Sequence, residues 1–147
     1  MEEIYAEWAA CCHFELYDDV PATLRQIARQ GLPIGLISNS HRCLASFQSH
    51  FELEGLIAAA VSSSEHGYMK PHPSIFDGAL RLVGVPAAAA VMVGDSLTHD
   101  IEGALQVGMR GVLVRRSGEP VPGRPAETDA TRAVPVIRSL TELPPLL

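Results

Sequence analysis

The sequence predicts an α/β fold in which a parallel sheet lies between two layers of helices. Four short apolar runs predict strands: PIGLIS (33–38), IAAAVSS (57–63), AVMVG (90–94) and GVLVR (111–115). Segments with helical periodicity separate these runs. Continuous apolar strands that alternate with helices are typical of a sheet buried on both faces. At 147 residues the chain is the size of one domain, so we expect a three-layer sandwich.

Three helices are predicted in the first half of the chain, over residues 3–14, 18–31 and 41–50. In the second of these helices, Pro21 suits the first turn and Gly31 suits the stop. For the third helix, Asn39 or Ser40 is the expected N-cap, because short polar side chains accept hydrogen bonds from the first free backbone amides.

The second half of the chain continues the alternation. A polar loop (64–71) precedes a helix that Pro73 opens and Gly84 closes. Another helix follows the 90–94 strand, with Thr98 as its expected cap. Residues 117–135 are rich in proline and glycine and predict a surface stretch, and residues 136–147 predict a strand or turn with a short helix.

Composition excludes several classes of function. The net charge of -6, with no basic cluster, gives no general attraction to nucleic acid. No apolar run approaches the ~20 residues of a membrane span, and the acidic N-terminus contains no signal-peptide core. The odd set of cysteines, Cys11, Cys12 and Cys43, is a poor disulfide framework and favours a reducing cytoplasm.

Two groups of residues raise the alternative of a metal site. Cys11, Cys12 and His13 are adjacent, but no second ligand pair follows at the spacing of a zinc site. Three histidines lie near the expected strand ends, namely His66, His72 and His99. Their spacing matches no standard metal motif, so surface or structural roles are the default expectation.

The candidate site lies where the strands end, because ligands of parallel α/β sheets bind beyond the carboxyl ends of the strands. The residues with useful chemistry at these ends are Ser38, Asn39, Lys70, Asp95 and Asp100. A hydroxyl and a lysine can hold a phosphate, and a rigidly placed carboxylate can bind Mg²⁺. Such a set suits phosphoryl transfer, where positioning and charge neutralisation do most of the work.

Each of these residues also has an ordinary structural interpretation. Ser38 and Asn39 suit a turn or a helix cap, and Lys70 before a proline suits a solvated loop. Asp95 suits a turn after a glycine, and Asp100 is favoured by the dipole of the helix that it begins. Their occurrence in order at one edge of the sheet favours a functional site over five unrelated structural roles.

Three segments resemble successive motifs of the haloacid dehalogenase-like hydrolases: GLISNS, KPHPSIF and VMVGDSLTHDIEGALQVGM. The resemblance covers residues 17–147 and implies a Rossmann-like core and a Mg²⁺-dependent phosphatase. By resemblance, Ser38 and Asn39 contact the phosphoryl group, and Lys70 steadies the charges of the phosphate and the nucleophile. Asp95 binds Mg²⁺, and Asp100 supports the metal shell or Lys70.

The N-terminal part of the chain differs from the family pattern. The family's first motif, Asp-x-Asp, supplies the attacking aspartate, and this sequence contains no Asp-x-Asp. Asp18 and Asp19 are adjacent and precede a helix, so they are poor substitutes. We interpret residues 1–16 as the last helix of a family cap and residues 17–147 as an incomplete core.

The absent strand has two expected consequences. The strands carrying the second and fourth motifs lose their common neighbour, which predicts self-association as a homo-oligomer or swapped dimer. The expected function is a phosphatase-type hydrolase of a small phosphorylated metabolite, inactive as this chain alone. A non-catalytic binding or interaction protein is the alternative, and a dehalogenase is less favoured because it needs no Mg²⁺ and would also need the absent aspartate.

Overall fold

The computed structural model describes residues 14–117 and 133–147, and it confirms the α/β class. The main elements, in chain order, are α2 (Asp19–Arg29), β1 (Ile34–Ser38), α3 (Leu44–His50), β2 (Ile57–Ser62), α4 (Ser63–His66), α5 (Pro73–Val83), β3 (Val91–Gly94), α6 (Gly103–Gln106), β4 (Arg110–Val114) and β5 (Val136–Ile137). Short 3-10 turns lie at Ala87–Ala89, Leu140–Glu142 and Pro144–Leu146, and a π-helical segment spans Leu97–Glu102. The expected helix over 3–14 lies almost wholly outside the described residues.

The strands form two sheets rather than one. β1 pairs with β2, and β3, β4 and β5 form the second sheet in that order. All three pairings are parallel, as the sequence predicts. Within the described residues, no strand pairs with the second edge of β1 or of β3. Among residues 14–117 and 133–147, β1 and β3 thus share no neighbouring strand.

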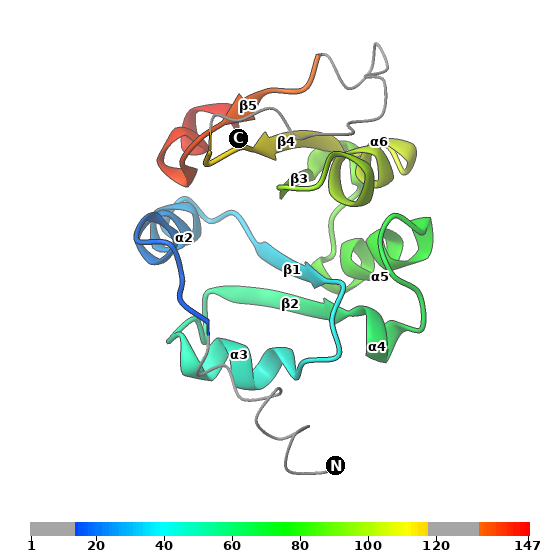
Figure 1. Ribbon diagram of the computed structural model, residues 1–147, viewed down its shortest axis with the longest axis horizontal. Coiled ribbons are helices and arrows are strands. Elements are labelled where there is room, and N and C mark those ends of the chain that lie inside the picture. Colours follow the sequence, from blue (N-terminus) through cyan, green and yellow to red (C-terminus); the bar gives the residue numbers. More distant parts are fainter. Residues whose placement is uncertain (1–13, 118–132) are drawn as a thin grey trace.

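Helices cover both sides of the two sheets. Figure 1 shows α2 on one side and α5 on the other, between the β1–β2 pair below and the three-stranded sheet above, with α6 beside β3 and β4 on the α5 side. On the α5 side, Ile75 and Phe76 pack with Val61 of β2 and Met92 of β3. On the α2 side, a second cluster joins three buried side chains from distant elements: Ile27, Val112 and Ile137. Helices thus bridge the two sheets and keep them in one molecule.

Helix ends differ from the predicted caps at two places. The third helix begins at Leu44 with Cys43 as its N-cap, so neither Asn39 nor Ser40 caps it. The reason is that the Asn39 amide bonds to the Lys70 backbone instead. After β3, Ser96 rather than Thr98 caps the turn, because its hydroxyl accepts from the His99 amide.

Other predicted boundaries hold. α5 begins at Pro73 and ends before Gly84, whose φ of 80° suits a residue without a side chain. The final segment forms the short strand β5 and two 3-10 turns, in place of a regular helix. None of the helices in the described parts is both long and apolar enough to cross a membrane.

Candidate functional site

A buried ion pair lies at the centre of the site. The Nζ atom of Lys70 is 2.6 Å from Oδ1 of Asp100, and the two side chains are only 11% and 6% exposed. Lys70 Nζ also donates a hydrogen bond of 3.1 Å to the carbonyl oxygen of Ile37 in β1. The second oxygen of Asp100 accepts a hydrogen bond of 3.0 Å from the amide of Ser96. Paired charges with further hydrogen bonds are the form in which ions are tolerated in a protein interior.

The ion pair connects the two sheets at their carboxyl ends. Lys70 contacts the end of β1 through Ile37, and Asp100 lies against Gly94, the last residue of β3. A Cβ atom added at Gly94 would lie 2.3 Å from Oδ2 of Asp100, which is far inside van der Waals contact. Only glycine therefore leaves room for the carboxylate to fold back over the strand end.

Asn39 holds the backbone of Lys70. Its Oδ1 accepts from the Lys70 amide at 2.7 Å, and its Nδ2 donates to the Lys70 carbonyl at 3.0 Å. The side-chain amide thus mimics one rung of a β-ladder between the β1 end and the loop before α5. Both of its polar atoms are engaged, so the predicted contact between Asn39 and phosphate stays a prediction.

Ser38 and Asp95 lie at the carboxyl ends of β1 and β3, the same edge at which the Lys70–Asp100 pair lies. Ser38 ends β1 and follows Ile37, and its hydroxyl donates to Ser40 Oγ at 3.0 Å. Asp95 follows Gly94 and is exposed. Within residues 14–117 and 133–147, no hydrogen bond reaches its carboxylate. Lys70, Asp100 and Asn39 are therefore in direct contact, and Ser38 and Asp95 flank them.

Arg115 is the residue whose role the sequence does not reveal. It follows β4, and its guanidinium donates to the backbone carbonyl of Asp95. This contact fixes the turn that presents the Asp95 carboxylate. Only its position just past a strand end could have indicated that Arg115 belongs to the site. An arginine side chain does not by itself indicate a backbone partner 20 positions away.

Of the adjacent acids Asp18 and Asp19, the second has a structural role. The Asp19 carboxylate accepts two hydrogen bonds from Arg116, at 2.8 and 2.9 Å, and one each from the Ser139 hydroxyl and the Leu140 amide. The Arg116 hydrogen bonds above all hold the pKa of Asp19 well below its usual range. This carboxylate anchors the start of α2 to the ends of β4 and β5.

The histidines have local partners. His66 Nε2 and His72 Nδ1 each lie 2.9 Å from the Ser74 hydroxyl, and His99 Nδ1 lies 3.0 Å from the Ser96 hydroxyl. Across the described part of the chain, no three His, Cys, Asp or Glu side chains gather as a metal site. The Cys11–His13 group lies outside the described residues.

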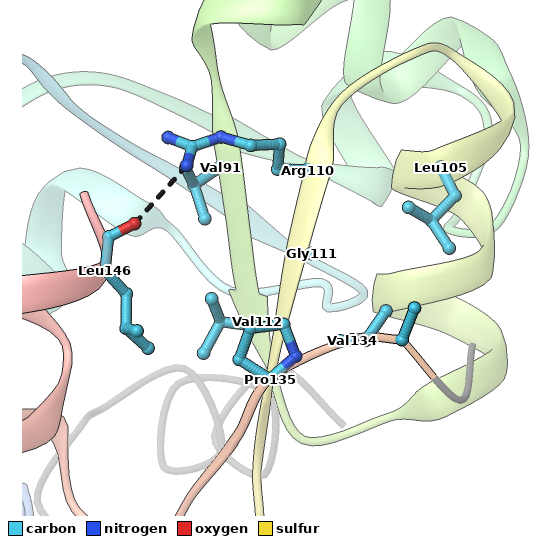
Figure 2. Close-up of a pocket in the computed structure, with 9 residues that line it drawn as sticks. Val91, Leu105, Arg110, Gly111, Val112, Val134, Pro135 and Leu146 are labelled. Atoms are coloured by element: carbon cyan, nitrogen blue, oxygen red, sulfur yellow. Dashed lines mark hydrogen bonds between the residues drawn. The ribbon is translucent and has the colours of Figure 1, made fainter. Parts of the chain in front are cut away.

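A separate cavity of about 300 Å³ lies at the other end of the strands. Figure 2 shows it beside Val91 and Arg110, which begin β3 and β4, with Val134 and Leu146 from the end of the chain. Its lining is mainly apolar, and the Arg110 guanidinium donates to the Leu146 carbonyl at 3.3 Å. None of the predicted site residues lines it.

Comparison with known proteins supports the predicted family. A family model of haloacid dehalogenase-like hydrolases matches residues 2–108. The chain is 32% identical, over 99% of its length and 57% of the relative's, to haloacid dehalogenase-like hydrolase domain-containing protein 3 of Bos taurus. It is 33% identical to N-acylneuraminate-9-phosphatase of Mus musculus, over 99% of this chain and 58% of that protein.

A solved structure gives the same result for the fold. The chain resembles the crystal structure of a HAD phosphatase from Thermococcus onnurineus with a TM-score of 0.80 and 26% identity. The match covers 99% of this chain and 63% of that one. The chain thus spans between 57% and 63% of the length of these three proteins.

Proposed function

Because the chain belongs to the haloacid dehalogenase-like hydrolase family, we propose that it supplies the phosphate- and Mg²⁺-binding part of a phosphatase-type hydrolase. The observation that carries the proposal is the buried Lys70–Asp100 pair, held between the carboxyl ends of β1 and β3. The phosphatase relatives of Mus musculus and Thermococcus onnurineus support this reaction class. Similarity to solved structures does not by itself separate it from dehalogenation, because a 2-haloacid dehalogenase of Pseudomonas syringae is 30% identical over 91% of this chain.

Phosphate binding rests on Lys70 and Ser38. A lysine ammonium has three N–H donors, and described residues engage two of those of Lys70, through Ile37 and Asp100. The third donor is left for a phosphate oxygen. Ser38 ends the strand next to Ile37, and its hydroxyl, which donates to Ser40 Oγ in this structure, would have to turn from Ser40 to donate to the same anion. A cation and a hydroxyl in a partly buried setting stabilise the negative charge of a transferring phosphoryl group.

The residues present fit Mg²⁺ in a specific way. Mg²⁺ is commonly held by one or two carboxylates with waters and substrate phosphates completing its shell. The exposed Asp95 carboxylate suits direct binding, whereas both oxygens of Asp100 already have protein partners. We therefore propose Asp95 as the metal ligand and Asp100 as a support for Lys70 and the metal shell. When bound, Mg²⁺ neutralises phosphate charge during the reaction.

The attacking group is the part that this chain does not provide. The sequence holds no Asp-x-Asp, and the Asp19 carboxylate is occupied by Arg116, Ser139 and Leu140. We propose that the chain alone binds phosphate and Mg²⁺ without turning over a phosphate ester. The proposed substrate class is a small phosphorylated metabolite, like the compound for which N-acylneuraminate-9-phosphatase is named. The cytoplasmic location stays a prediction from cysteine usage.

The test measures binding and turnover separately. Titration calorimetry with MgCl₂ in the presence of inorganic phosphate should show saturable Mg²⁺ binding. Asp95→Asn should weaken it by roughly tenfold or more, because a carboxylate ligand is lost. Asp77→Asn, the same change at an exposed position on α5, is the control and should bind as the parent does. Hydrolysis of p-nitrophenyl phosphate that Asp95→Asn abolishes would overturn the claim that the chain alone is inactive. Absence of Mg²⁺ binding would overturn the metal site.

A further inference from the structure

Arg115, the residue that follows β4, offers a place for a second anion beside the proposed phosphate site. We propose, resting on the phosphatase function above, that its guanidinium binds a carboxylate carried by the leaving group of the substrate. The substrate class is then a small phosphate monoester with a carboxylate a few bonds away from its phosphate.

Two consecutive arginines after β4 differ in their partners. Arg116 donates two hydrogen bonds to the Asp19 carboxylate, and its guanidinium lies 3.8 Å from the centroid of the Tyr17 ring. In the part of the chain that the structure describes, Arg115 donates to the backbone carbonyl of Asp95 and forms no ion pair. The Arg115 side chain is nevertheless partly withdrawn from water. A cation in that setting favours an anionic partner, and Arg115 has room for one.

The Arg115 guanidinium retains most of its donors. It has five N–H groups in a planar fork, and the contact with Asp95 engages Nη1. A carboxylate can accept two of the remaining N–H groups in parallel, which is the geometry that arginine favours. One guanidinium balances the single negative charge of a carboxylate, whereas a second phosphate brings a charge of about −2 at neutral pH. The charge at this position therefore favours a carboxylate over a further phosphate.

The turn that follows β3 lies between Arg115 and the phosphate site. On the β1 side of this turn, Asp100 accepts from the Ser96 amide and holds Lys70. On the β4 side, Arg115 donates to the carbonyl of Asp95, whose exposed carboxylate is the proposed Mg²⁺ ligand. The two cations thus contact one turn from opposite sides. An anion at Arg115 is therefore a different group from the phosphate at Lys70.

The spacing of the strands sets the length of the leaving group. β3 and β4 are paired up to Gly94 and Leu113, so Arg115 lies two residues beyond the last pair. Neighbouring strands lie about 4.8 Å apart. A chain of about three carbon atoms between the ester oxygen and the carboxylate spans about this distance.

A general positioning role of Arg115 can be separated from carboxylate binding. Displacement of Asp95 weakens the binding of every phosphate ester to a similar degree, because each ester depends on the same Mg²⁺ and Lys70. Loss of the carboxylate contact weakens only those esters that carry a carboxylate. The ratio of the affinities for two esters, one with and one without the carboxylate, therefore reports carboxylate binding alone.

The experiment compares 3-phosphoglycerate with glycerol 3-phosphate. The two esters share a three-carbon chain and a phosphate, and the first alone has a carboxylate. Titration calorimetry on the full chain, at one fixed concentration of MgCl₂, gives the two dissociation constants. We expect the parent to bind 3-phosphoglycerate roughly tenfold more tightly, because a bidentate ion pair forms with Arg115. Arg115→Gln should abolish this preference, whatever its effect on the two affinities individually.

Two further variants complete the test. Arg110→Gln is the matched control, because Arg110 begins the strand that Arg115 follows and lies at its opposite end. It removes the same charge from the chain and should leave the ratio at the parent value. Arg115→Lys keeps the charge without the planar fork and should lower the ratio by roughly threefold or more. This variant decides the question if Arg115→Gln does not fold.

Three outcomes would overturn the carboxylate site. Equal affinity of the parent for the two esters would show that the site does not recognise a carboxylate, while the phosphate site itself would stand. A preference that the Arg115 variants retain, with both esters weakened equally, would leave Arg115 as a residue that only positions Asp95. Binding of neither ester by the parent would remove the phosphate site, and with it both the proposed function and this role of Arg115.

Discussion

The carboxylate of Asp100 lies directly over the α-carbon of Gly94, closer than any side chain at position 94 would allow. Asp100 belongs to the π-helical segment that follows β3, so the chain doubles back on the strand that it has just left. This return places Oδ1 beside Lys70 and Oδ2 beside the Ser96 amide. The glycine is thus part of the site, although it has no functional group.

The first prediction concerns Gly94→Ala. The added methyl would displace Asp100 and break its buried bond to Lys70, so we expect a loss of about 3 kcal/mol in the free energy of unfolding. Urea denaturation measures it. Gly31→Ala is the control, because Gly31 has a φ of 76° and open space around it. That change should cost only about 1 kcal/mol through backbone strain. Equal losses in the two variants would contradict the steric argument.

The second prediction tests the coupling of Lys70 and Asp100. Removal of one partner leaves a buried charge uncompensated, so Lys70→Met and Asp100→Asn should each cost about 3–5 kcal/mol. The double variant should lose less than the sum of the two, because neither charge is then left alone. A thermodynamic cycle from urea denaturation checks this. Additive losses would show that the two side chains stabilise the fold independently.

The fold class could be predicted because strand and helix patterns are local properties of the sequence. The apolar runs at 33–38 and 90–94 form β1 and β3 within a residue, and Pro73 with Gly84 bounds α5 as expected. The split into two sheets differs from the single sheet that the patterns predict, although the lack of the first motif did predict unpaired edges on β1 and β3. The order of strands in a sheet depends on residues far apart in the sequence, so the expected neighbours of β1 and β3 rest on the resemblance to the family and not on local patterns.

The site could be predicted only in outline. Strand ends locate Ser38, Lys70 and Asp95, because parallel strands end at one edge. The contacts of Asn39 with the Lys70 backbone, 31 residues away, could not be predicted. An amide after a strand suits a helix cap equally well, and the tertiary partner overrides that local preference.

The third prediction uses the pH dependence of stability. The Arg116 hydrogen bonds lower the pKa of Asp19 in the folded protein, so its contribution is fully present above the unfolded pKa of about 3.9. It is lost as the pH falls through the lower folded value. Asp19→Asn should therefore be less stable by about 1–2 kcal/mol near pH 7, with the gap to the parent closing below about pH 4. Urea denaturation across pH measures it. Asp18→Asn is the exposed control, and a gap that persists at low pH would contradict the linkage.

The fourth prediction separates positioning of Lys70 from general stability. Asn39→Ala removes both hydrogen bonds to the Lys70 backbone and should cost about 2 kcal/mol in unfolding free energy. Gln48→Ala, which removes one hydrogen bond to Leu44 within α3, is the matched amide control and should cost less than about 1 kcal/mol. The positioning role requires a second effect, because a displaced Lys70 loses its fixed place for an anion. Binding of inorganic phosphate with Mg²⁺, measured by calorimetry, should weaken roughly tenfold in Asn39→Ala and stay unchanged in Gln48→Ala. Equal phosphate affinity in the two variants would show that Asn39 stabilises the fold but does not position Lys70 for anion binding.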